Sequence, residues 1–190
     1  IMTVSIISYG YSMEMAVEGV PYLRGSDGQG YYMQALMLSG GDVMAKSAAL
    51  SINYVGYQVV LAHLFKIVGG DLLFALVLNN ILIILTVVML YKAVLVATTN
   101  DKIAYYSIIS FMLLGVYIYY ANLLLKEPFL VFSVALLMYG VALLEKRRGS
   151  GVVVALCVLL PVLIFSTMRV PLLTVVPMSF LAISRIPFRR

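Results

Sequence analysis

The chain has 190 residues, of which 63% are hydrophobic and only 11% are charged. Soluble domains average about half apolar and a quarter charged residues, so the composition excludes an ordinary soluble domain and indicates an integral membrane protein. The net charge of +5 collects near the ends of apolar segments, which fits membrane orientation and anionic lipid headgroups, not a nucleic-acid surface. The single cysteine, Cys157, excludes an intrachain disulfide.

The first seventy residues divide into an apolar and a polar part. Residues 1–16 are apolar but short for a bilayer helix, so they predict a truncated first span, and we expect the sequence to be a fragment of a longer chain. Residues 17–70 predict an external loop that carries juxtamembrane helices. Within that loop, Tyr31–Leu38 favours a short amphipathic helix. Ser47–Val68 favours a helix on the membrane surface, because its Asn, Gln, His and Lys residues suit an interface better than a span.

Residues 71–190 predict about five membrane spans. Asp71 reads as a helix-start residue, and Asn79-Asn80 inside the first of these spans predicts hydrogen bonds between helices. The expected fold class is all-α: a polytopic transmembrane helical bundle with external juxtamembrane helices, forming a single module over residues 1–190. The predicted spans are Leu72–Tyr91, Ile103–Leu125, Phe129–Leu144, Gly151–Met168 and Pro171–Ile183.

The distribution of basic residues predicts the orientation of these spans. Lys146-Arg147-Arg148 is the strongest basic cluster, so the positive-inside rule assigns that loop to the cytoplasm. Alternation then places residues 98–102 inside and residues 69–71 outside, together with Lys126 and, further on, Arg169. These two are isolated external cations. We therefore expect a multi-pass protein of a cytoplasmic-type membrane, plasma or inner, whose functional groups face the external side.

Two acidic residues are the candidate catalytic groups. Glu127 stands between two long apolar runs, and a carboxylate so close to hydrocarbon is usually paired, solvated in a cavity or functional. Asp27 lies in a glycine-rich part of the first loop, and an external position for both would give a two-carboxylate site. A structural role stays open for each of them. Asp27 could cap a helix that starts near Gly30, and Glu127 could favour a helix N-terminus with Lys126 as its partner.

The order of these motifs resembles the C-type glycosyltransferase superfamily, which includes the protein O-mannosyltransferases and the lipid A aminoarabinose transferases. Asp27, followed by Tyr31 and Tyr32, is similar to the acidic residue early in the first external loop of that family. The run Lys126–Phe129, Lys-Glu-Pro-Phe, is similar to its second external acidic motif, with Glu where Asp is common. The resemblance covers roughly residues 26–169.

Two further segments carry the same resemblance. Tyr54–Gly70 is similar to a family stretch with a Tyr and a later Phe-Gly, although its Pro is absent here. Asn100–Ala104 is similar to the short basic cytoplasmic turn before the third span. Because members of the family usually have further spans, the resemblance implies that this chain supplies only the N-terminal transmembrane module.

The resemblance implies a transferase that moves a sugar from a polyprenyl-phosphate donor to a lipid-linked, glycan or protein acceptor, as in polysaccharide biosynthesis. Asp27 would accept the proton of the acceptor hydroxyl or amine. Glu127 would orient a substrate or, with Asp27, hold Mg²⁺ or Mn²⁺, although these ions prefer more oxygen ligands. Lys126 and Arg169 would stabilise the leaving lipid phosphate, or simply reach towards the membrane interface. The substrate-binding set is Lys126, Arg169, Tyr31 and Tyr32.

Two other functions stay open. The chain could be a non-catalytic membrane scaffold subunit of the same fold, with a membrane protein as partner. It could also be a polysaccharide polymerase or a flippase-like transporter, although its spans are nearly free of charge, which argues against a charged pathway. In each case membrane lipids surround the chain and nucleic acid is not a partner.

Overall fold

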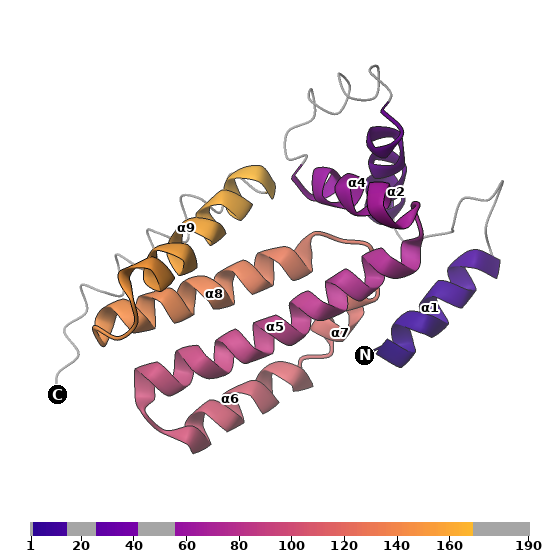
Figure 1. The fold of residues 1–190 in the computed structure, drawn as a ribbon. Coiled ribbons are helices and arrows are strands. Elements are labelled where there is room, and N and C mark those ends of the chain that lie inside the picture. Colours follow the sequence, from indigo (N-terminus) through magenta and orange to yellow (C-terminus); the bar gives the residue numbers. More distant parts are fainter. Residues whose placement is uncertain (1, 15–25, 42–55, 169–190) are drawn as a thin grey trace.

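The computed structural model describes residues 2–14, 26–41 and 56–168, and the regular secondary structure in these ranges is helical without strands (Figure 1). This confirms the all-α class. The helices are α1 (Met2–Glu14), α2 (Ser26–Ser39), α4 (Gly56–Val68), α5 (Leu72–Thr98), α6 (Asp101–Leu113), α7 (Val116–Ala121), α8 (Glu127–Glu145) and α9 (Gly151–Met168).

Three of the described helices, α5, α8 and α9, are long and apolar enough to cross a membrane. The predicted bounds of α9 agree with the structure, and α8 extends slightly beyond its predicted ends at Phe129 and Leu144. The central helix α5 continues past its predicted end at Tyr91 to Thr98. With a rise of 1.5 Å per residue, its length is about 40 Å.

The region predicted as one helix over Ile103–Leu125 is divided in two, so that expectation is wrong. Helix α6 ends at Leu113, the backbone N–H of the following Leu114 donates to the carbonyl of Phe111, and α7 begins after Gly115. Glycine weakens a helix interior, and across the break the rings of Phe111 and Tyr117 stack with centroids 4.1 Å apart. The helical conformation is interrupted at Leu114, whose ψ angle is 86°, directly before Gly115.

Short sequence signals explain how α5 begins. Gly69 and Gly70 have φ angles of 82° and 81°, a left-handed conformation that suits glycine and ends α4. Asp71 then caps α5, because its side chain accepts a hydrogen bond of 2.8 Å from the backbone N–H of Leu73. The prediction that Asp71 starts a helix is confirmed. The last turn of α4 is thereby joined directly to the first turn of α5.

The helices pack side by side around α5, with α6 on one flank and α8 on the other, and α9 lies against α8 (Figure 1). Helix α1 also contacts α5, while α2 packs on α4 and α4 reaches both α5 and α9. Helices α5 and α8 run in the same direction, because Asn79 near the start of α5 contacts the loop that leads into α8. The starts of α5 and α8 therefore lie at one end of the array, and the ends of both helices lie at the other.

We call the first of these ends the α2/α4 end. It contains α2, α4, the first turns of α5 and α8, and the last turn of α9. The opposite end, which we call the basic end, contains the α5–α6 and α8–α9 turns. Lys102 and the cluster Lys146-Arg147-Arg148 lie there and are exposed. Residues 98–102 and the loop with Lys146-Arg147-Arg148 were predicted to lie on the same side of the membrane, and the structure places both at this end of the array.

Candidate functional site

A cluster of aromatic rings joins three helices at the α2/α4 end. Tyr57 of α4 is completely buried, and its ring meets Tyr31 of α2 edge-on with centroids 5.3 Å apart. On its other side it meets Phe129 of α8 at 5.7 Å, again close to edge-on. Such pairs are favoured because the positive edge of one ring faces the negative face of another. The cluster fixes α2 against the start of α8.

Two residues that the sequence assigned to one site contact each other through this cluster. The ammonium nitrogen of Lys126, just before α8, lies 5.8 Å from the centroid of the Tyr31 ring. A cation at this distance from an aromatic face is attracted by the electrons of the ring. The acidic segment at 126–128 is therefore held against the helix that carries Asp27.

Glu127 brings a partly buried carboxylate to the same place. Its Oε2 atom is shielded from solvent and has no hydrogen-bond partner in the part of the chain that the structure describes. A buried polar atom without a partner is costly and requires an explanation, such as a role in binding or catalysis. As the first residue of α8, Glu127 also favours the helix N-terminus, which agrees with the structural role left open for it.

The pKa of the Tyr57 hydroxyl depends on its burial and on the charge of Glu127. Burial raises the pKa of Tyr57 above its ordinary value of 10, a hydrogen bond from Asn79 lowers it, and the negative charge of Glu127 raises it. The hydroxyl therefore stays protonated at neutral pH. It provides a neutral O–H group close to a carboxylate in a water-poor region.

Asp27 lies in the first turn of α2 and is exposed. The helix begins at Ser26, so the expectation that Asp27 caps a helix starting near Gly30 is wrong, and its charge instead favours the helix N-terminus from within. Residues four apart share one face of a helix, which places Asp27 one turn before Tyr31 on the face that meets Lys126. The carboxylate is exposed to solvent.

The remaining candidate residues differ in position. Tyr32 is buried, and its hydroxyl donates a 2.9 Å hydrogen bond to the carbonyl of Gly70, while its ring packs on Phe65. This tyrosine fastens α2 to the α4–α5 turn, a role that the sequence did not suggest. Arg169 lies outside the described residues.

A metal site at Asp27 and Glu127 stays a prediction. Within residues 2–14, 26–41 and 56–168, no group of three or more His, Cys, Asp or Glu side chains lies together as metal ligands would. Mg²⁺ and Mn²⁺ take about six oxygen ligands, so two carboxylates would leave most positions to substrate phosphate and water.

Sequence reasoning missed Tyr57, which is the centre of the cluster. A signal was present: Tyr57, Leu61 and Phe65 recur every fourth residue and are all buried, as expected for the inner face of a helix. Hydrogen bonding also joins α2 and α4, since the Gln58 amide donates to the side-chain oxygen of Gln34 at 3.1 Å. The pattern predicted the buried face but not its partners.

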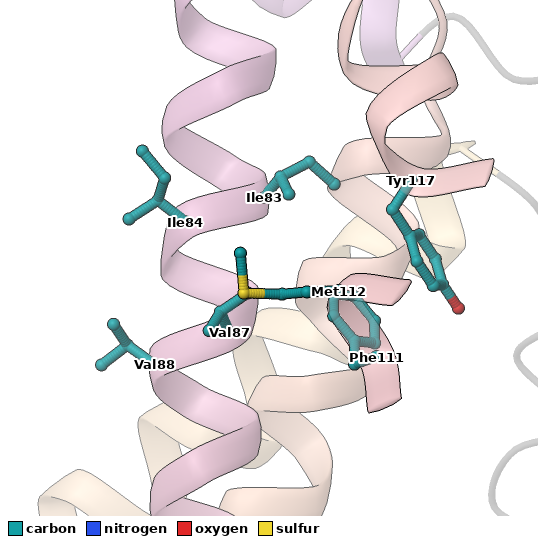
Figure 2. Close-up of a pocket in the computed structure, with 7 residues that line it drawn as sticks. All are labelled: Ile83, Ile84, Val87, Val88, Phe111, Met112 and Tyr117. Atoms are coloured by element: carbon teal, nitrogen blue, oxygen red, sulfur yellow. The ribbon is translucent and has the colours of Figure 1, made fainter. Parts of the chain in front are cut away.

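A second feature is an apolar groove at the break between α6 and α7 (Figure 2). It has a volume of about 220 Å³, and in Figure 2 the Tyr117 hydroxyl points away from α5. Because its walls are almost entirely hydrocarbon, it suits an apolar ligand, not a sugar or a phosphate. Its walls are Ile83, Ile84, Val87 and Val88 of α5, Phe111 and Met112 of α6, and Tyr117.

The site at the α2/α4 end therefore combines an exposed acid, a partly buried acid, a cation and a buried tyrosine hydroxyl. These groups can accept a proton, attract an anion and orient a hydroxyl-bearing ligand. No protein-family model matches the chain, and no curated protein or solved structure matches it either.

Proposed function

We propose that the chain is the transmembrane module of a glycosyltransferase of the C type. It transfers a sugar from a polyprenyl-phosphate donor to a lipid-linked, glycan or protein acceptor. The observation that carries the proposal is the contact of Lys126 with Tyr31, which joins two acidic segments far apart in the sequence at one end of the array. A scaffold without a substrate would not need an acid at both segments.

The proposed location is a plasma or inner membrane, crossed several times, with the α2/α4 end on the external side. Three described helices are long and apolar enough for such spans, which supports this location. The exposed basic cluster Lys146-Arg147-Arg148 lies at the opposite end, which the positive-inside rule assigns to the cytoplasm. Helices α2 and α4 would then lie at the external surface.

Each site residue has a defined role in the proposed reaction. Asp27 accepts the proton of the acceptor hydroxyl or amine while that atom attacks the sugar carbon. The bond from the sugar carbon to the phosphate oxygen breaks, and the charge left on the lipid phosphate is stabilised by Lys126 and, from the following segment, Arg169. Glu127 orients the substrate, and a bound divalent cation would add further positive charge there.

The direct test is donor-dependent transfer by the full-length protein in liposomes, measured as release of polyprenyl phosphate from a labelled polyprenyl-phosphate sugar. Loss of a general base costs about 10²- to 10⁴-fold, so we expect Asp27→Asn to reduce turnover by at least about 100-fold. Glu127→Gln should reduce it as well. The matched control is Asp101→Asn, because Asp101 is also an exposed acid in the first turn of a helix but lies at the basic end.

Two outcomes would contradict the proposal. Turnover by Asp27→Asn equal to that of the parent would exclude Asp27 as the base. A parent protein that shows no turnover with any donor, yet co-purifies with a membrane protein, would instead support the scaffold function.

A further inference from the structure

Asn79 occupies an unusual place in the apolar helix α5. Its side chain is completely buried, two turns after the start of the helix. The amide nitrogen donates to the backbone carbonyl of Leu123 at 2.9 Å and approaches the carbonyl of Leu125 at 3.4 Å. It also lies 3.5 Å from the hydroxyl oxygen of Tyr57. One amide thus contacts the α7–α8 loop and the centre of the aromatic cluster.

Asn79 donates to a loop whose backbone leaves the helical pattern. Helix α7 ends at Ala121, and the following residues form turns before α8 begins at Glu127. The Leu123 carbonyl also accepts from the backbone N–H of Leu125 at 2.9 Å, so Asn79 adds a second donor to this turn. A buried carbonyl that loses a donor costs free energy. Asn79 directs its N–H groups at the carbonyls of Leu123 and Leu125, and Leu125 directly precedes Lys126.

The orientation of the amide is determined by these contacts. Oδ1 of Asn79 is buried and has no hydrogen-bond partner among the described residues. Turning the amide over would direct this oxygen at the carbonyl oxygens of Leu123 and Leu125, which would repel it. The structure therefore leaves one acceptor unsatisfied while both contacts to the loop are kept.

The neighbouring Asn80 provides a comparison, because its amide donates within its own helix. It is equally buried, at 2% exposed, but its amide donates to the carbonyl of Leu76 in its own helix at 2.8 Å. Two adjacent buried asparagines thus differ in these amide bonds: the Asn79 amide donates to the α7–α8 loop, and the Asn80 amide donates within α5. Asn80 is a natural control for Asn79.

We infer that Asn79 is a positioning residue that holds Lys126 and Glu127 against Tyr31 and Tyr57. It acts through the backbone of the α7–α8 loop and does not contact the substrate. The effect of Asn79 on sugar transfer rests on the proposed function. Its effect on the position of the α7–α8 loop does not depend on that function. An error of about 1 Å in the position of a catalytic group can lower a rate by about 10²-fold, so the loop is a sensitive point.

Hydrogen–deuterium exchange of the full-length protein tests the loop independently of activity. In Asn79→Ala we expect the backbone amides of residues 122–126 to exchange at least about tenfold faster, while those of α8 stay protected. Asn80→Ala should leave exchange in this loop at the parent rate. If Asn79→Ala does not fold, Asn79→Leu removes the donor while keeping the volume. Unchanged loop exchange in the folded variant would overturn the inference.

Transfer kinetics provide the second readout. We expect Asn79→Ala to lower kcat by at least about tenfold, with a thermal unfolding temperature similar to that of Asn80→Ala, which should keep its kcat. An equal loss of kcat in both variants would indicate only a structural role and overturn the inference. If the parent itself shows no transfer, the proposed function fails, and the exchange comparison still decides whether Asn79 holds the loop.

Discussion

The two ends of the helical array are built in different ways. At the basic end, polar groups are exposed and bond to near neighbours in the sequence: Asn100 caps α6 by accepting from the N–H groups of Lys102 and Ile103. At the α2/α4 end, polar groups are buried and bond over long sequence separations, as Tyr32 does with Gly70 and Asn79 with Leu123. Ordering side chains that are far apart in the sequence costs conformational entropy. Such contacts are expected where the residues of a site must be held in fixed positions.

The comparison also separates two kinds of charge. The cations at the basic end are exposed, and under the proposed orientation the positive-inside rule would account for their position. At the α2/α4 end, Lys126 lies instead over the ring of Tyr31, and one carboxylate oxygen of Glu127 is shielded from solvent. Under the proposed function, charge at the basic end would orient the protein and charge at the α2/α4 end would take part in the reaction.

The largest expected effect on stability comes from filling the closest helix contact at the α2/α4 end. A Cβ atom at Gly56 would lie 2.7 Å from the Cβ of Thr167 and 2.9 Å from its carbonyl oxygen. Because the backbone of α9 would have to move, we expect Gly56→Ala to destabilise the protein by about 1–3 kcal/mol, measured by thermal unfolding in detergent.

The matched control for this change is Gly151→Ala at the basic end, where an added Cβ meets nothing within 4 Å. We expect it to leave stability unchanged or slightly raised, since alanine favours helices. Equal effects of the two substitutions would contradict the close contact between α4 and α9.

A smaller effect should appear at high pH. The pKa of Tyr57 is raised in the folded protein by burial and by Glu127, so the stability linked to its neutral form is complete below pH 10 and is lost as pH rises further. The loss is at most about 1.4 kcal/mol per pH unit. We expect Tyr57→Phe to remove this part of the loss between pH 10 and 12. Tyr105→Phe, at an exposed position on α6, should not.

The measurement is the free energy of unfolding as a function of pH in the three proteins. An identical decline in the parent and in Tyr57→Phe would show that the Tyr57 hydroxyl ionises as readily in the folded chain as in the unfolded one. The buried cluster would then be more open to water than the structure indicates.

Hydropathy alone predicted much of the fold. The long apolar runs predicted α9 and most of α5 and α8, and caps such as Asp71 follow local rules. The break at Leu114-Gly115 was not predicted, since both residues fit an apolar span. The stacking of Phe111 on Tyr117 depends on the fold and cannot be read from periodicity.

The candidate site was predicted in part. Tyr31 and Lys126 were selected from their motifs, and the structure brings them into contact. Tyr57 was missed because its neighbours come from α2 and α8, and Asn79 was expected to bond between helices without a known partner. Contacts of this kind depend on how distant segments meet, which a single sequence does not specify.

The sidedness of Asp27 tests the central claim most directly, because the proposed chemistry requires the α2/α4 end to face the external side. Asp27→Cys and Arg148→Cys, each combined with Cys157→Ser, can be exposed in intact cells to a maleimide that does not cross membranes. Both positions are exposed in the structure, and Cys157 is the only native cysteine. We predict that position 27 is labelled at once and position 148 only after the membrane is opened. Labelling of position 148 in intact cells, with position 27 protected, would contradict the account.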